Sequence, residues 1–454
     1  MKNFSITPTD KNALELLRID PINRNNSVFR FIKLIDTVEG GCSIALNGEW
    51  GSGKTMFVKQ VKLVMDFKNP HFDRSKADGL YENSGFLNSI SCYESYSTVY
   101  YDAWENDSHE DSLLSLIYAT IRSNQHLFDA DKRRNLSEIL GKLLDVITER
   151  NVSDFFNQLK GDTPLEVIEQ SENINLLMRE FLDSLIAEKG NRLVIFVDEL
   201  DRCRPSYAVQ LLERIKHFFY DERITFVFSV NFSQLQHTVK SYYGPFFDAT
   251  RYLDKFFDLR VAMPPVDYNR FFDYKFPFVQ SRYIYDRVCR QVIQYFSFSL
   301  RETERYLQMM KIAAYSSTHN TYAPSFSEEK ASYFATVYFV PIMIGLNMAD
   351  LDGYKEFILG KNSEIIFKII GNMNDFVRYD LLGINRANEV SESEIQKEIE
   401  TKIKEIYSTL FSPGEFEMIR EKRIGEMSFS ENTRNEMLET VSLLSKRADY
   451  DIEI

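Results

Sequence analysis

A run of eight residues, 48–55, has the composition best suited to chemistry in this chain. Its sequence is GEWGSGKT, which fits the pattern G-x-x-x-x-G-K-[ST] without a mismatch. Glycines let the backbone come close to phosphate groups, so that its N–H groups can bind them, and the positive end of a following helix adds to the attraction. We therefore predict a phosphate-binding site. The predicted binding residues are Gly48, Glu49, Trp50, Gly51, Ser52, Gly53, Lys54, Thr55 and Met56.

Two side chains of this loop have specific predicted roles. Lys54 would contact the β- and γ-phosphates of ATP, and the Thr55 hydroxyl would hold Mg²⁺. A glycine-rich turn before a helix can also occur by chance. The context argues against chance, because residues 42–47 (CSIALN) are predicted as an apolar strand and residues 56–67 as a helix.

A group of acidic residues follows a second apolar run. Residues 192–197 (RLVIFV) are typical of a buried parallel strand, and DELDR follows directly. Ligands bind at the carboxyl ends of such strands. Asp198 would orient Mg²⁺ through water, Glu199 would act as the general base that polarises the attacking water, and Asp201 is a second acid nearby. The alternative is a solvated strand end, which the complete phosphate loop upstream makes a poorer explanation.

A third strand end carries Asn231, directly after the apolar run 224–230 (ITFVFSV). A polar side chain at this place can sense the γ-phosphate in related ATPases. It could equally cap a helix predicted over residues 232–240. Both alternatives stay open at this point.

The remaining pattern places these motifs in an α/β fold with a parallel sheet. Further strands are predicted at 97–103 and 258–263, and further helices at 28–38, 111–121, 207–220 and 250–257. Residues 130–190 are predicted to be almost entirely helical, with one helix starting at Thr163–Pro164. From residue 268 the chain is predicted to be helical and irregular, with no return of strands.

Domain boundaries follow from the same pattern. Pro264–Pro265 is the clearest boundary in the chain. We predict a core domain over residues 1–265, with a helical insertion at about 105–190, and a mainly helical region over 266–454.

Composition limits the partners and the compartment. The chain has 454 residues and a net charge of −13. An acidic chain is poorly suited to coat nucleic acid, although a local basic patch leaves nucleic acid open as a partner. The four cysteines include no C-x-x-C pair, which fits a reducing cytosol, and the first residues lack the apolar segment of a signal peptide. We therefore predict a cytoplasmic protein.

Residues 331–349 (ASYFATVYFVPIMIGLNMA) contain no charge and approach the length of a membrane span. A buried helix pair, broken near Pro341, is the alternative that we favour, because a membrane span should be more uniformly apolar.

Five segments together resemble the KAP family of P-loop NTPases, within the wider group that includes the AAA+ and STAND ATPases. They are GEWGSGKT at 48–55, YYDAW at 100–104, FVDELDRCRP at 196–205, RYLDKFFDLRVAMPP at 251–265 and the arginine-containing helix at 301–305. Lys54 and Asp198 are 144 positions apart (198 − 54), and this family typically holds a large helical insertion there. Family members often carry membrane spans in that insertion, whereas residues 56–190 here contain no long uncharged run, so we expect no membrane anchor.

The resemblance implies a bacterial ATPase in which Mg²⁺-dependent hydrolysis drives a conformational change in a multi-protein assembly. One branch of the family resembles the ATPase subunit of antiphage operons such as the Qat type, which implies protein partners encoded nearby and self-association or a hetero-complex. Arg251, with Lys255 as the alternative, would reach a neighbour's γ-phosphate, and Arg301 or Arg305 would be the in-chain sensor. Each could instead form an ordinary surface salt bridge.

Two other functions remain compatible with the sequence. One is a nucleotide-gated scaffold or signalling switch with little turnover, which steady-state phosphate release would distinguish from an ATPase. The other is a membrane-associated signalling ATPase anchored by residues 331–349.

Overall fold

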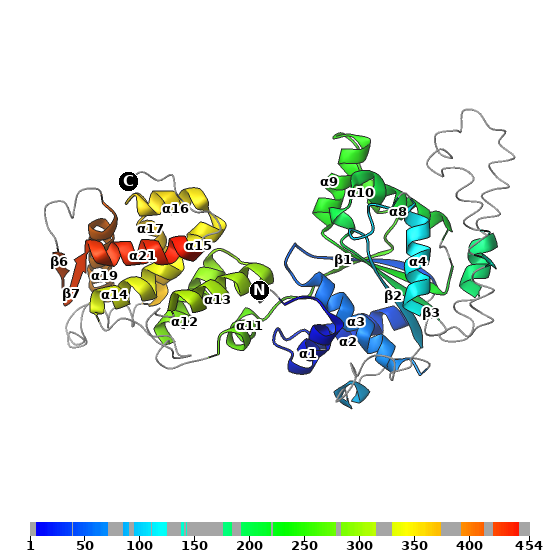
Figure 1. Cartoon of the computed structure of the whole chain (residues 1–454), viewed down its shortest axis with the longest axis horizontal. Helices are drawn as coiled ribbons and strands as arrows, with labels where there is room; N and C mark the ends of the chain where they lie inside the picture. The colour runs from blue at the N-terminus through cyan, green and yellow to red at the C-terminus, as the bar shows by residue number, and fades with distance from the viewer. Residues whose placement is uncertain are drawn as a thin grey trace. The chain divides into compact units, whose positions relative to one another are not determined.

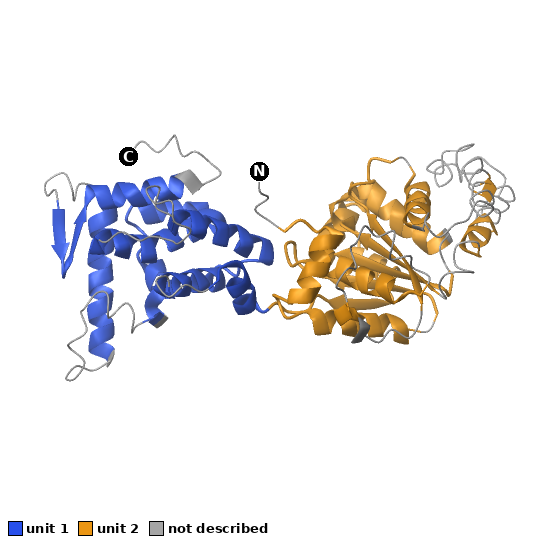
Figure 2. Cartoon of the chain, turned by 60° about the horizontal axis from the view of Figure 1, so that its bottom comes forward, with its two compact units in different colours: residues 1–5, 267–454 blue, residues 6–266 orange. Residues whose placement is uncertain are grey.

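The structure is a computed structural model, and it describes most of the chain. The described residues are 6–38, 40–70, 85–89, 95–109, 111–124, 138–139, 142, 176–183, 192–218, 221–277, 283–314, 329–373, 392–412 and 421–444. The chain divides into two compact units, one over residues 6–266 and one that contains residues 267–454 (Figure 2). The division falls after Val266, one residue beyond the Pro264–Pro265 pair.

The first unit, which we call the nucleotide unit, is built on a five-stranded sheet in the order β2-β3-β4-β1-β5. All of its pairings are parallel. The strands are β1 (Cys42–Asn47), β2 (Tyr96–Asp102), β3 (Arg192–Asp198), β4 (Ile224–Val230) and β5 (Leu259–Ala262). Each lies where the sequence predicts a strand, so the predicted α/β fold with a parallel sheet is confirmed.

Alternating side chains of β3 show how helices cover both faces of this sheet. Leu193, Ile195 and Val197 belong to a buried cluster with residues of α4 (Ser112–Asn124) and α8 (Pro205–Phe218). Val194 and Phe196 belong to a second cluster on the other face. That face is covered by α1 (Asp10–Ile19), α2 (Asn25–Thr37) and α3 (Lys54–Lys68) (Figure 1). Because successive side chains of a strand point to opposite faces, an uninterrupted apolar strand is the pattern of a sheet between two helical layers.

Two helices lie between β4 and β5. They are α9 (Phe232–Tyr243) and α10 (Ala249–Leu253). The second is shorter than the predicted helix over 250–257. Phe257 is buried against Phe228, with 5.2 Å between ring centroids. This contact is the reason that the helix ends before Phe257 and the chain continues into β5.

The predicted helical insertion falls mostly outside the described residues. Within it the structure describes α4 and helical residues at 138–139, 142 and 176–183. The predicted helix start at Thr163–Pro164 lies outside the described residues.

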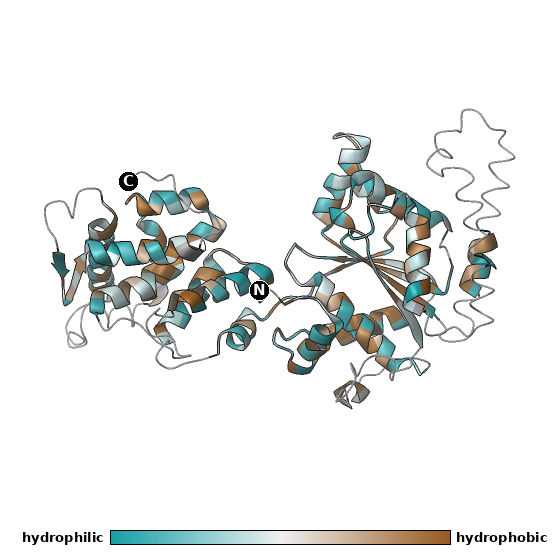
Figure 3. Ribbon diagram, viewed as in Figure 1, coloured by the Kyte–Doolittle hydropathy of each residue, from teal (hydrophilic) through white to brown (hydrophobic). Residues whose placement is uncertain are grey.

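The second unit, which we call the C-terminal unit, is mainly helical and has one large apolar core (Figure 3 colours all elements by hydropathy). Its longer helices are α11 (Tyr268–Lys275), α12 (Tyr283–Tyr295), α13 (Leu300–Ala314), α15 (Val340–Ala349), α16 (Leu351–Ile358), α17 (Glu364–Ile370), α19 (Glu392–Phe411) and α21 (Glu431–Leu444).

A β-hairpin in this unit corrects the expectation that no strand returns after residue 268. Its strands are β6 (Glu421–Ile424) and β7 (Met427–Ser430), and they pair antiparallel. Gly425 turns the chain with φ 62°. Met427 and Phe429 alternate inward and join the apolar core. Strands of only four residues give too short an alternation of apolar and polar positions to be recognised in the sequence.

The uncharged stretch 331–349 is a continuous helix rather than a broken pair. It starts as α14 (Lys330–Phe334), continues as a π-helical segment over Ala335–Phe339 and ends as α15. The π-helical turns precede Pro341, which lacks an N–H group. The wider spacing of their backbone hydrogen bonds lets the helix continue past the proline without a break. The helix is long and apolar enough to cross a membrane by length and composition alone, but 78% of its most apolar window is buried inside the unit.

Candidate nucleotide-binding site

The loop between β1 and α3 has the backbone shape that phosphate binding needs. Gly51 and Gly53 have φ 78° and 87°, values that L-residues with side chains rarely adopt. A Cβ on Gly48 would lie 2.5 Å from Met263 Cγ, so a larger residue there would disturb the packing beneath the loop. Gly53 is the N-cap of α3 and gives no side-chain cap, which leaves the first N–H groups of the helix for a ligand. The Ser52 hydroxyl is buried with no hydrogen-bond partner among the described residues.

The start of this loop is fixed to the end of β4, the neighbouring strand. Gly48 N–H donates to Val230 O at 3.1 Å. Asn231 Nδ2 donates to Glu49 Oε2 at 2.9 Å. The Asn231 side-chain oxygen also accepts from Gln234 N–H at 3.3 Å and caps α9. The capping alternative for Asn231 is therefore confirmed, while its amide group remains directed at the loop.

Arg24 is a residue of this region that the sequence reasoning missed. Its side chain is buried, with 3% exposed. Its guanidinium donates to Ser52 O at 2.7 Å, to Pro264 O at 2.6 Å and to Pro265 O at 3.4 Å. It therefore connects the phosphate loop with the end of the nucleotide unit. A single arginine in the lead-in, more than twenty positions before the loop, gave no signal for this contact.

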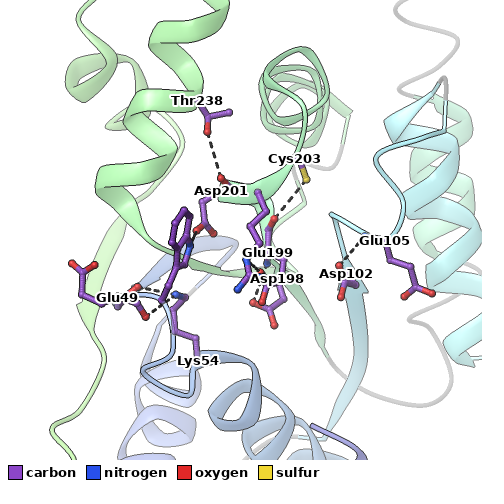
Figure 4. Close-up of polar contacts among 12 residues, drawn as sticks. Glu49, Lys54, Asp102, Glu105, Asp198, Glu199, Asp201, Cys203 and Thr238 are labelled. Carbon is purple, nitrogen blue, oxygen red and sulfur yellow. Dashed lines mark hydrogen bonds and ion pairs between the residues drawn. The ribbon is translucent and has the colours of Figure 1, made fainter. Parts of the chain in front are cut away.

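Lys54 is held inside the loop by backbone carbonyl groups. Its Nζ donates to Gly48 O at 2.8 Å and to Glu49 O at 3.2 Å. Burial lowers the pKa of Lys54, and the nearby carboxylates, above all Asp201 and Asp198, oppose this shift. Figure 4 shows Lys54 on the same edge of the sheet as Asp198 and Glu199. The predicted lysine and acids are thus brought together.

Asp198 ends β3 and is almost fully buried, with 1% exposed. It accepts hydrogen bonds from Tyr100 Oη at 3.0 Å and from the Glu199 N–H at 3.0 Å. Burial raises the pKa of Asp198, while hydrogen bonds, the largest from the Thr55 hydroxyl, oppose this shift. Thr55 and Asp198 therefore lie near one another at this edge and offer the hard oxygen donors that Mg²⁺ prefers.

These two side chains fit a Mg²⁺ ion that keeps phosphate and water oxygens as its other ligands. Among the described residues no group of three or more His, Cys, Asp or Glu forms a separate metal cluster. Mg²⁺ is usually held by one or two protein side chains together with substrate phosphates. The predicted pair thus suits Mg²⁺ better than a metal that needs a complete set of protein ligands.

Glu199 has a strained backbone, with φ 59° and ψ 23°. Only a few per cent of residues other than glycine adopt positive φ, and they are frequent at functional sites. Burial and the adjacent Asp198 raise the pKa of Glu199 to about 7, and Arg202, with which it forms an ion pair, opposes the shift. A carboxyl group with a pKa near neutrality suits a general base.

Asp201, the predicted second acid, is engaged by the phosphate loop. Its Oδ2 accepts a 2.6 Å hydrogen bond from Trp50 Nε1. The sequence predicts Trp50 only as a member of the loop, so this contact between two strand ends is new. It leaves Glu199 as the better placed of the two for accepting a proton from water.

Of the predicted basic residues, Arg251 and Lys255 belong to the nucleotide unit, whereas Arg301 and Arg305 belong to the C-terminal unit. Arg251 is on α10, its side chain is 88% exposed, and it forms an ion pair with Asp248 at 3.5 Å. Lys255 is exposed just after α10. Arg301 and Arg305 are on α13 of the C-terminal unit, where Arg301 is exposed and Arg305 half-buried.

A parallel sheet between helices, with a glycine loop before a helix and acids at the end of another strand, defines a P-loop NTPase domain. The sequence model of the KAP family P-loop domain matches residues 24–277, more than half of the chain. The chain belongs to the KAP family, and the resemblance seen in its sequence is confirmed. This membership indicates nucleotide binding, with hydrolysis as the activity such a domain can perform. A comparison with curated proteins finds no match.

Proposed function

We propose that this protein hydrolyses ATP with Mg²⁺ and uses the cycle to change conformation within a multi-protein assembly. One observation carries the proposal. A buried lysine in a glycine loop lies on the same sheet edge as two carboxyl groups, one near a threonine of the loop and one with a pKa near neutrality. These are the parts that phosphoryl transfer to water requires.

Each part has a chemical role in this proposal. Lys54 exchanges its carbonyl partners for the β- and γ-phosphates, and the N–H groups at the start of α3 bind the same phosphates. Thr55 and Asp198 hold Mg²⁺, which when bound neutralises charge on the phosphates. Glu199 accepts the proton of the attacking water. Asn231, whose amide is fixed to the loop through Glu49, orients groups near the γ-phosphate.

Calorimetry of Lys54→Ala tests the binding step. Removal of a charge-assisted contact of about 1.5–3 kcal/mol should weaken ATP affinity by about 10- to 100-fold. Lys33→Ala, on the exposed side of α2, is the matched control and should bind like the wild type. Equal affinity of the wild type and Lys54→Ala would refute the assignment of the phosphate loop.

Association with a second molecule is the next part of the proposal. Arg251 is exposed, and nearby aromatic side chains are exposed as well: Tyr242 by 45%, Tyr243 by 41% and Phe246 completely. Exposed aromatic residues next to an arginine are typical of protein interfaces. We place Arg251 at such an interface, where it stabilises the transition-state charge in a neighbour's site. Arg301 is the proposed in-chain sensor.

Turnover of Arg251→Ala, measured together with ATP affinity, tests this part. The rate of hydrolysis should fall while the affinity for ATP stays nearly constant, because an arginine supplied by a neighbouring molecule stabilises charge that develops only in the transition state. Arg18→Ala, an exposed arginine on α1, should have no effect. Specific activity should also rise with protein concentration or on addition of the partner. Constant specific activity of a monomer over a wide dilution series would refute the shared site.

The biological setting follows from the family resemblance. We propose a cytoplasmic antiphage system in which nearby genes encode the protein partners. Phage plating on cells that carry the whole gene cluster tests this setting, and Lys54→Ala should abolish any protection. If the intact gene cluster reduces the plating of no phage in a broad panel, relative to cells without the cluster, the antiphage setting would be refuted.

A second candidate function is a nucleotide-gated scaffold with little turnover. The ion pair between Glu199 and Arg202 favours it, because the candidate base already has a partner. Steady-state phosphate release distinguishes the two functions. Sustained release supports the ATPase, whereas nucleotide-dependent capture of a partner without sustained release supports the scaffold.

A further inference from the structure

The chain contains two tryptophans, and both lie at the candidate site. Trp50 belongs to the loop after β1, and Trp104 follows β2. Their side chains are 47% and 53% exposed. The Arg202 guanidinium lies 5.9 Å from the Trp50 ring centroid and 5.5 Å from the Trp104 ring centroid. An arginine within this distance of two indole rings is attracted by both.

Arg202 also contacts the candidate base. It forms an ion pair with Glu199, three residues earlier, and the exposed side-chain fractions are 24% and 18%. Its neighbour Asp201 accepts the hydrogen bond of the Trp50 indole. The short 3₁₀ helix η4 (Leu200–Arg202) is therefore connected to the phosphate loop by two contacts of one tryptophan.

Both tryptophans have supports that do not depend on Arg202. The sheet order places β4 between β1 and β3, so Trp50 reaches over the end of β4, to which its loop is bonded through Gly48. Trp104 follows Ala103, whose N–H donates to Asp198 O at 2.9 Å. The backbone next to each tryptophan is thus bonded to the sheet without the help of Arg202.

We propose that Arg202 is a positioning residue, which Trp50 and Trp104 hold against Glu199 so that the phosphate loop controls the orientation of the candidate base. This inference rests on the proposed hydrolysis. An exposed ion pair three residues apart would have little effect by itself. Here the pair is mostly buried, and the planar guanidinium is oriented by two aromatic faces, which a lysine could reproduce only in part.

Kinetics of Arg202→Met provides the first test. Loss of orientation should lower kcat by about 10- to 100-fold, less than complete loss of a base, and leave ATP affinity unchanged. Arg202→Lys should recover part of the rate. Arg204→Met is the matched control, because that side chain is 59% exposed and paired with Asp107 at 3.7 Å; it should keep the wild-type rate.

Tryptophan fluorescence provides a second test that needs binding but no hydrolysis. In Trp50→Phe, Trp104 is the sole tryptophan, and a phenyl ring still faces Arg202. Addition of ADP with Mg²⁺ should change the emission of Trp104. The change should disappear when Arg202→Met is added to this variant and persist when Arg204→Met is added.

The outcomes separate this inference from the proposed function. A wild-type kcat in Arg202→Met, an equal loss in Arg204→Met, or a loss of affinity as large as the loss of rate would overturn the positioning role. If the wild type binds ATP without hydrolysing it, the proposed hydrolysis alone is refuted. The dependence of Trp104 fluorescence on Arg202 would then test whether Arg202 is held between the two tryptophans. A wild type that binds no nucleotide would overturn both.

Discussion

The two units of this protein bury their polar residues in different ways. In the nucleotide unit, Lys54, Asp198, Asp201 and Asn231 are all nearly buried at the carboxyl edge of the sheet. In the described part of the C-terminal unit, the buried charged residues are Asp286 and Glu304, on separate helices, and Glu304 forms an ion pair with Lys275. Burial of a charge is costly unless it is paired. Asp66, Arg192 and Arg214 are also buried in the nucleotide unit, but each is bonded to a partner away from this edge. The group of Lys54, Asp198 and Asp201 at one edge therefore marks a place for ligand chemistry.

The apolar residues show the opposite contrast. In the C-terminal unit a single cluster extends over α12 to α21 and the hairpin. Gly345 of α15 packs closely against α12, since a Cβ on Gly345 would lie 2.5 Å from Val292 Cγ1 of α12. Such packing makes a rigid body rather than a reactive site. The comparison teaches that the candidate site and its buried charges belong to one unit, whereas the other unit is built mainly on apolar packing.

Glu199→Gln tests the chemical side of this comparison and has the largest expected effect. The amide fills the same space but cannot accept a proton, so the rate of hydrolysis should fall by about 10²–10⁴-fold while ATP binding is kept. Phosphate release and calorimetry measure the two quantities. Glu105→Gln, an exposed carboxylate near the same sheet edge, is the control. Wild-type hydrolysis by Glu199→Gln would move the role of base to another group.

Phe339→Ala tests the packing side. Phe339 is fully buried and packs near Phe357 and Phe411, each with 6.3 Å between ring centroids. Its loss should cost the C-terminal unit about 3–5 kcal/mol without changing ATP affinity. Both tryptophans lie in the nucleotide unit, so urea unfolding followed by tryptophan fluorescence reports that unit alone, whereas far-UV circular dichroism reports both.

The expected result is a circular-dichroism transition of Phe339→Ala at lower urea with an unchanged fluorescence transition. Leu359→Ala, at a side chain that is 44% exposed, should shift neither. If the circular-dichroism and fluorescence transitions of Phe339→Ala shift together, the two units unfold as one, and packing in the C-terminal unit also stabilises the nucleotide unit.

Arg24→Met tests whether a buried polar residue outside the motif serves the loop. Three carbonyl groups, among them Ser52 O, would lose their donor. The expected cost is about 1–3 kcal/mol of stability in the nucleotide unit, together with weaker ATP binding. Thermal unfolding and calorimetry measure both. Arg30→Met on the exposed side of α2 is the control, and identical behaviour of the two variants would remove Arg24 from the site.

Local patterns explain how much of the site could be predicted. Lys54, Thr55, Asp198 and Glu199 belong to short motifs next to strands, and strand ends of a parallel sheet meet at one edge. Their proximity therefore follows from the sequence once the strands are recognised. The ends of β1 and β4 were also predictable, because each is a mostly apolar run that is followed directly by Gly48 or by Asn231.

Contacts that depend on the sheet order were not predictable. Trp50 meets Arg202 because β4 alone separates β1 from β3, and no local pattern states that order. Arg24 reaches Pro264 across 240 positions. The π-helical turns before Pro341 and the hairpin at 421–430 were missed for another reason. Tertiary packing determines them, and local propensity is a weak guide in such segments.

Asn231→Ser has the smallest expected effect and separates the two roles of this residue. A serine keeps an oxygen that can cap α9, and serine and asparagine are about equally good caps. It lacks the amide that donates to Glu49 at 2.9 Å. Stability should therefore change by less than about 1 kcal/mol, while turnover should fall several-fold if the amide orients groups at the γ-phosphate. Asn231→Ala removes both functions and serves as the reference. Wild-type turnover and stability in the Asn231→Ser variant would make Asn231 a helix cap only, and the polar cluster at the sheet edge would then extend over the ends of β1 and β3 without the end of β4.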